Sequence, residues 1–292
     1  MATASDPVAD DVRASFDAED FVGARNKAVA ALADRPDDSE LLRLAGLSGL
    51  ELDDPEAIGY LERAAEAAPD DPDAWRELGG ALTFAGRLQE AGAAFRRATE
   101  LRPSDTRVLV DLGHVVLGTG QVEEALPYFE QARKHEPGNT EALPALVEVY
   151  RRAGRLEDGL VVAKELSDAR PDDVAAALDV VDLALDLDRL DDAEAGCRRA
   201  RGADDDPEHE VYLLHALIEI ETRRERWRRA LDLAVEATRV DRLGRTTDVL
   251  AFVVAQVFGE PDRQAPPREE IERALADSRL EHRRLHLEAV GI

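Results

Sequence analysis

The sequence contains one cysteine, few lysines and few aromatic residues, and each shortage narrows the possible classes of protein. Because Cys197 stands alone, the chain can form neither an internal disulfide nor a zinc site built from cysteines. Aromatic residues are 4% of the 292 residues, so the 44% hydrophobic content comes mainly from Ala, Leu and Val. This composition favours closely packed helices over the aromatic-rich strands of a β-sandwich.

Positive charge is also scarce. The 63 acidic residues outnumber the 37 basic ones, which gives a net charge of −26, and only Lys27, Lys134 and Lys164 are lysines. Such an anionic chain is a poor partner for nucleic acid or an anionic membrane. The composition resembles that of halophilic archaeal proteins, because concentrated salt screens carboxylate repulsion to a Debye length of about 3 Å at 1 M. A GC-rich genome, which replaces Lys with Arg, is the alternative.

Long hydrophobic runs are missing as well. Residues 1–6 lack the basic region and apolar stretch of a signal peptide. The longest strongly apolar stretch, residues 249–258, is too short to span a bilayer. We therefore expect a cytoplasmic protein without a membrane partner.

What the sequence does contain is a period of 34 residues. Prolines, leucines and glycines recur at this step, which is the length of one supersecondary unit in several repeat proteins. The three series are Pro69, Pro103, Pro137 and Pro171; Leu44, Leu78, Leu112 and Leu146; and Gly86, Gly120 and Gly154. This recurrence predicts an array of repeats.

The block 72–105 predicts a pair of helices. Its apolar residues fall at i, i+3 and i+7 in the first half and at i, i+4 and i+7 in the second, so each helix has one apolar face. Gly86 stands between them, where a helix end needs the left-handed conformation. Pro103 stops the second helix, and Asp105 can cap the next one. The apolar positions are Trp75, Leu78, Leu82, Ala91, Phe95 and Ala98.

This block resembles the tetratricopeptide repeat, and so does the next block, 106–139. The resemblance implies an all-α fold, a right-handed superhelical solenoid of helix-turn-helix repeats. We expect the array to fill residues 1–244, with three extra residues inserted between 202 and 210. The expected repeats are 5–37 (degenerate), 38–71, 72–105, 106–139, 140–173, 174–210 and 211–244 (degenerate).

Residues 245–292 depart from the period, and we expect them to form C-terminal capping helices. A stacked array leaves the end of its core bare, and a terminal helix with one polar face would cover it. Dimerisation or docking by these helices is the alternative.

The sequence offers little catalytic chemistry, and we expect neither an enzyme nor a cofactor. Cys197 occupies the second-helix position held by Phe95 and Phe129 in other repeats, which indicates a small core residue. His282 and His286 have a spacing that can bind a metal, but no third ligand stands at a matching position, so no metal site is expected.

In the family that these repeats resemble, first helices line a concave groove that binds partners. The resemblance therefore implies a binding groove built from first-helix positions that point away from the core. Arginines in it would favour an acidic peptide, because a guanidinium forks onto a carboxylate. Pairing of each arginine with a neighbouring Asp or Glu is an almost equal alternative. The expected groove residues are Leu42, Arg43, Arg76, Gly80, Arg107, Val110, His114, Glu148, Arg151 and Arg152.

The leading functional hypothesis is thus a protein-interaction scaffold that binds a peptide or helix of a partner protein in this groove. Self-assembly is a second hypothesis, because acidic and basic residues nearly balance in the last third of the chain and five arginines cluster there. An acidic surface of a second copy could meet that cluster. A third hypothesis is a non-catalytic regulatory subunit of an enzyme or transcription complex. The clustered arginines are Arg223, Arg224, Arg226, Arg228 and Arg229.

Overall fold

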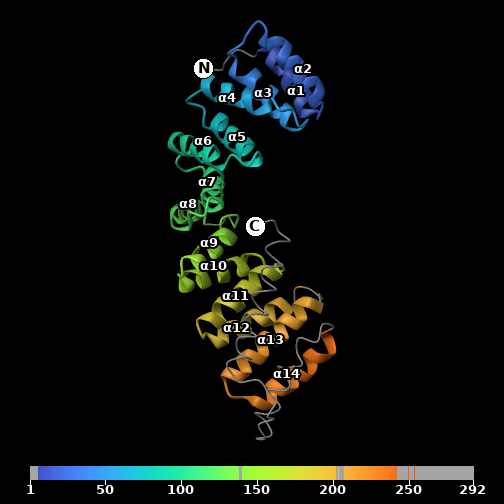
Figure 1. The fold of residues 1–292 in the computed structure, drawn as a ribbon, viewed down its shortest axis with the longest axis vertical. Helices are drawn as coiled ribbons and strands as arrows, with labels where there is room; N and C mark the ends of the chain where they lie inside the picture. Colours follow the sequence, from blue (N-terminus) through green and yellow to red (C-terminus); the bar gives the residue numbers. More distant parts are fainter. Residues whose placement is uncertain are drawn as a thin grey trace. The chain divides into compact units, whose positions relative to one another are not determined.

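The computed structural model describes residues 6–137, 140–201, 203, 207–241, 249 and 253. The described residues form fourteen α-helices and no strand, which confirms the all-α prediction. The chain divides into two compact units, Met1–Ala145 and Leu146–Ile292. In Figure 1, consecutive helices of each unit lie side by side, joined by short turns.

The helices follow one another in helix–turn–helix pairs. The first unit holds α1 (Pro7–Asp17) with α2 (Phe21–Leu32), α3 (Ser39–Leu50) with α4 (Ala57–Ala67), α5 (Pro72–Phe84) with α6 (Leu88–Leu101), and α7 (Thr106–Gly118) with α8 (Val122–His135). The helix α9 (Leu143–Arg152) crosses the division between the units. The second unit continues with α10 (Leu156–Ala169), α11 (Val174–Asp186) with α12 (Leu190–Arg201), and α13 (Pro207–Arg223) with α14 (Trp227–Val240).

Aspartates begin several of the first helices. The Asp71 side chain accepts a hydrogen bond from the Asp73 amide at 3.0 Å, and Asp105 accepts one from Val108 at 3.4 Å. Asp173 does the same with Ala176 at 3.2 Å. Each carboxylate satisfies an amide that the helix leaves unpaired, so the local sequence fixes where these helices start.

A residue with left-handed backbone conformation lies in every turn inside a pair. Glycine holds this position in the three central repeats, with φ of +73° at Gly86, +83° at Gly120 and +70° at Gly154. Non-glycine residues hold it elsewhere: Glu19, Asp53, Asp188 and Glu225. From Asp188 to Glu225 the step is 37 residues, three more than the period, as the expected insertion between 202 and 210 requires.

Glycine also allows the two helices of a repeat to approach closely. A Cβ atom on Gly79 would lie 2.8 Å from the Phe95 ring, and one on Gly113 would lie 2.6 Å from the Phe129 ring. The buried rings of Phe95 and Phe129 thus pack directly on helix backbone. Cys197 is buried at the equivalent place, which confirms its interpretation as a core residue.

One repeat boundary differs from the expectation. Helix α13 begins at Pro207, four residues before the predicted start at 211, because proline is favoured in the first turn of a helix. Of the predicted capping region, 245–292, only Val249 and Val253 are described; both are buried and pack with Leu214 and Ile218 of α13. His282 and His286 lie outside the described residues. Within the described part of the chain, none of the helices combines the length and apolar character needed to cross a membrane.

Candidate functional site

In the first unit, the expected groove positions lie on α3, α5 and α7, the first helices of successive pairs. Arg43 on α3 bonds to Glu77 on α5 at 2.9 Å and to Glu40 within its own helix at 3.0 Å. The hydrogen bond with Glu40 is the main cause that raises the pKa of Arg43. This arginine therefore ties two helices together, as the pairing alternative predicts.

Arg76 and Arg107 are in a different situation. The closest carboxylate to Arg76 is Asp73 at 3.9 Å, and the closest to Arg107 is Asp105 at 4.0 Å. Both distances lie at the outer limit of an ion pair. The Arg76 side chain is 30% exposed, and its buried Nε has no hydrogen-bond acceptor; the Arg107 side chain is 67% exposed.

A third arginine explains this weak pairing. Arg102 holds both oxygens of Asp73 at 3.1 Å and one oxygen of Asp105 at 3.2 Å. The other oxygen of Asp105 accepts the capping hydrogen bond of α7. Because the nearest carboxylates are engaged by other donors, the guanidiniums of Arg76 and Arg107 retain bonding capacity for a ligand.

Two acidic groups on the same helices are partly withdrawn from water. Burial raises the pKa of Glu77 and that of Asp111, although nearby guanidiniums oppose the shift in both cases. One carboxylate oxygen of Glu77 bonds to Arg43, and the other is buried without a hydrogen-bond partner. Glu77 is thus held between α3 and α5, while Asp111 is partly exposed on α7 near Arg76 and Arg107.

The remaining expected residues of the first unit separate into exposed and buried ones. His114 is exposed, and its ring meets the Phe129 ring edge-on at a centroid distance of 5.1 Å. Surrounding helices desolvate it enough to lower its pKa. Gly80 is exposed too. Leu42 and Val110 are buried, so the expectation that they face a groove is wrong; both pack in the core of the unit.

In the second unit, the expected groove residues have partners within the chain. Arg151 on α9 bonds to Asp179 on α11 at 2.8 Å and lies 3.7 Å from Asp182, and its side chain is only 12% exposed. Arg152 bonds to Glu148 in the same helix at 2.7 Å. Arg151 therefore ties α9 to α11, and Arg152 is paired within its own helix, as the pairing alternative predicts.

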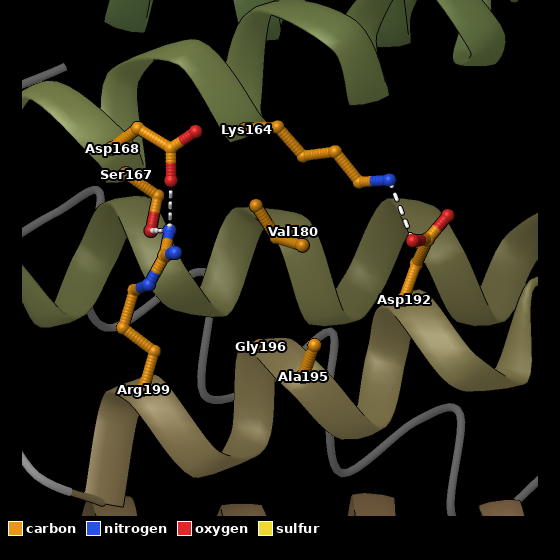
Figure 2. Close-up of a pocket in the computed structure, with 8 residues that line it drawn as sticks. All are labelled: Lys164, Ser167, Asp168, Val180, Asp192, Ala195, Gly196 and Arg199. Atoms are coloured by element: carbon orange, nitrogen blue, oxygen red, sulfur yellow. Dashed lines mark hydrogen bonds and ion pairs between the residues drawn. The ribbon is translucent and has the colours of Figure 1, made fainter.

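Figure 2 shows a pocket of 210 Å³ over α10, α11 and α12, which sequence reasoning did not anticipate. An ion pair closes each end: Lys164 with Asp192 at 2.6 Å, and Arg199 with Asp168 at 2.8 Å. Between them lie small apolar residues, among them Val180 and Gly196. The two ion pairs join α10 to α12. Because Lys164 and Arg199 are already paired, they offer little charge to a ligand.

Two arginines of the cluster near the end of the array, Arg223 and Arg224, are closely paired with carboxylates. Arg223 bonds to Asp188 at 3.2 Å, and Arg224 bonds to Glu194 at 2.7 Å and to Asp191. Arg226 and Arg229 lie within 3.8 Å of the buried Glu221. The contacts of Arg224 and Arg229 connect α13 and α14 to α12, while Arg226, Arg228 and Arg229 remain exposed.

Reactive and metal-binding groups are sparse in the part of the chain that the structure describes. Burial raises the pKa of the Cys197 thiol to about 12, so it stays protonated at neutral pH. The described residues contain no group of three or more His, Cys, Asp or Glu side chains placed to hold a metal ion.

Comparison with known proteins identifies the repeat. Two models of the tetratricopeptide repeat match the chain, one over residues 53–106 and one over residues 116–178. No curated protein sequence is significantly similar to the chain.

Solved structures of tetratricopeptide repeat (TPR) solenoids have the same fold. MamA is 21% identical, with a TM-score of 0.52 over 57% of this chain and 96% of MamA. PilF of Pseudomonas aeruginosa is 16% identical, with a TM-score of 0.54 over 66% of this chain and 88% of PilF. YrrB, described as a TPR protein with an unusual peptide-binding site, is 17% identical, with a TM-score of 0.54 over 61% of this chain and 92% of YrrB. At these identities the similarity establishes the TPR fold.

Sequence reasoning missed one exposed residue of the TPR array. Phe84 is the last residue of α5 and is 85% exposed. Its spacing could have revealed it, because Arg76, Gly80 and Phe84 follow each other at steps of four, on the helix face opposite the buried Leu78 and Leu82. We call the surface formed by the half-buried Arg76 and the exposed Gly80, Phe84, Arg107 and His114 the α5–α7 face.

Proposed function

We propose that the protein is a non-catalytic interaction scaffold whose α5–α7 face binds a carboxylate-bearing segment of a partner protein. The observation that carries the proposal is the weak pairing of Arg76 and Arg107, whose nearest carboxylates lie 3.9 and 4.0 Å away and are engaged by Arg102 or a helix cap. In a chain with net charge −26, two guanidiniums that are only weakly paired on neighbouring helices favour an anionic ligand.

Three further points support this function. The TPR fold presents first helices side by side, and YrrB, which shares the fold, is described as having a peptide-binding site. The expected groove arginines of the second unit, Arg151 and Arg152, have carboxylate partners, so the proposal narrows the groove to the first unit. The acidic, lysine-poor composition supports a salt-rich cytoplasm as the place of action.

Charge reversal tests the proposal. Proteins captured by the wild-type chain should be lost when Arg76→Glu and Arg107→Glu are combined, because both bonds to the partner carboxylate become repulsive. The matched control is Arg96→Glu on α6, which reverses an exposed arginine outside the α5–α7 face. Capture should be followed in parallel with helicity by circular dichroism. A double variant that is folded and keeps every partner would remove this face from the function.

A further inference from the structure

Phe84 has no role in the packing of its own repeat. Among the described residues it is the most exposed large hydrophobic side chain, at 85%, and the next most exposed are Val22 and Val161 at 57%. The core side of α5 is supplied by the buried Leu78 and Leu82. An aromatic ring left in water forgoes the stabilisation of burial, so the fold alone gives no reason for phenylalanine at this position.

The surroundings of Phe84 leave room for a ligand. Gly80, one turn before it, is exposed, and a Cβ atom placed there would have no other atom within 4 Å. The first helix of the following repeat, α7, contacts α5. It carries Gly118 at the position one period after Phe84. No side chain from that position covers the Phe84 ring. The surface between Arg76 and Phe84 is therefore open.

The chemistry of the surface changes along the helix. Arg76 stands near the start of α5 and Phe84 at its end, eight residues further. At a rise of 1.5 Å per residue the separation is roughly 12 Å. Arg107 is near the start of α7, so the guanidiniums belong to the same end of the two helices. One end of the face is cationic and the other is apolar.

We propose that the α5–α7 face recognises an extended peptide segment with a carboxylate and a large apolar side chain three to four residues apart. The carboxylate bonds to Arg76 and Arg107, and the apolar side chain packs on Phe84. An extended chain advances about 3.3 Å per residue, so three to four residues cover the roughly 12 Å between the two ends. Gly80 gives the ligand main chain space to approach. This inference rests on the proposed function and specifies its ligand.

A spacing series of synthetic peptides tests it. Each fluorescein-labelled peptide has two adjacent glutamates and one phenylalanine in a Gly/Ser background, with the second glutamate and the phenylalanine one to nine positions apart. Binding to the full chain is measured by fluorescence anisotropy in 0.15 and 1 M KCl. We expect the tightest binding at a separation of three or four, and weaker binding of those peptides in the higher salt.

Variants assign the two contacts. Phe84→Ala should weaken the best peptide roughly five- to tenfold, the effect of losing an aromatic contact, and should reduce the preference for one spacing. Val161→Ala, which truncates an exposed apolar side chain on α10, should leave binding unchanged. Because Phe84 is exposed, its truncation should not alter the circular dichroism spectrum.

The outcomes distinguish this inference from the function on which it rests. Binding that is lost on Arg76→Glu with Arg107→Glu, but is indifferent to Phe84→Ala and to spacing, would overturn the two-point ligand and keep the carboxylate-binding face. Peptides that bind equally well to the double arginine variant, or not at all at millimolar concentration, would overturn both. An optimum near eight residues would indicate a helical ligand and would overturn the extended one.

Discussion

Two glycines next to each other in α5 show how the surroundings of one residue decide its role. Gly79 lies against Phe95, and the corresponding Gly113 lies against Phe129, whereas Gly80 faces open space. The 34-residue register predicts that Gly79 and Gly113 share one environment, and the structure agrees. A small residue at this position is required by contact, because added atoms would force the ring or the helix to move.

We expect Gly113→Ala to destabilise the protein by about 1–2 kcal/mol. Overpacking a tight core costs about 1–3 kcal/mol, and the better helix propensity of alanine returns at most about 1 kcal/mol. Gly80→Ala is the matched control and should stabilise by up to about 1 kcal/mol, since its methyl group meets nothing. Thermal melts followed by circular dichroism measure both variants. If the two substitutions shift the midpoint equally, the packing explanation is wrong.

Arginines illustrate how far a sequence can assign single residues. Arg43 and Glu77 are one period apart, so the repeat itself places them on adjacent first helices, where they bond at 2.9 Å. Arg151 and Asp179 are 28 residues apart, and no periodic argument joins them. The weak pairing of Arg107 depends on Arg102, which holds Asp105 three residues along the chain and also Asp73, 29 residues away, through packing between helices.

At the scale of elements, the turns inside the helix pairs share one conformation despite different residues. Glycine adopts the left-handed region without cost, but the same region costs other residues about 1–2 kcal/mol. Glu225 has φ of +58° in the turn between α13 and α14. The geometry of the helix pair therefore imposes the left-handed conformation. Only the central repeats have glycine, the residue best suited to it, at this position.

Glu225→Gly should stabilise the last repeat by about 0.5–1 kcal/mol. The substitution removes the strain of a left-handed glutamate, and the greater freedom of glycine in the unfolded chain offsets part of the gain. Gly120→Ala, in the turn between α7 and α8 with φ of +83°, should act in the opposite direction. Native-state hydrogen exchange of α14 reports the first variant, and that of α8 the second. Slower opening of α14 in Glu225→Gly is the expected result, and faster opening would contradict it.

At the scale of the whole molecule, electrostatic repulsion and attraction set how stability depends on salt. A net charge of −26 repels itself, while the ion pairs between helices attract over short distances. Salt weakens both, but exposed pairs contribute only about 0–1 kcal/mol each, so release of the long-range repulsion should prevail.

We therefore expect the melting temperature to rise by several degrees between 0.05 and 0.5 M KCl. The Debye length falls from about 14 Å to about 4 Å across this range, which screens carboxylates on neighbouring helices from each other. Circular dichroism at 222 nm follows the transition, and sucrose, which stabilises by exclusion without screening, is the control. A melting temperature that is constant or falls with KCl would show that the ion pairs outweigh the repulsion, and the salt-adapted interpretation would then fail.

The sequence by itself determined the parts of this protein that depend on local spacing. Helix starts at aspartate caps, turns at Gly86, Gly120 and Gly154, and the burial of Phe95, Phe129 and Cys197 all follow from a 34-residue period, because each involves residues close in the chain or one repeat apart. Only the tertiary structure decided which polar and apolar groups remain available. It buried Leu42 and Val110, gave Arg43 and Arg151 carboxylate partners, left Arg107 and Phe84 exposed, and left Arg76 half-buried with only a weak ion pair. Exposure and pairing depend on every neighbour that surrounds a side chain, and a repeat pattern specifies only some of them.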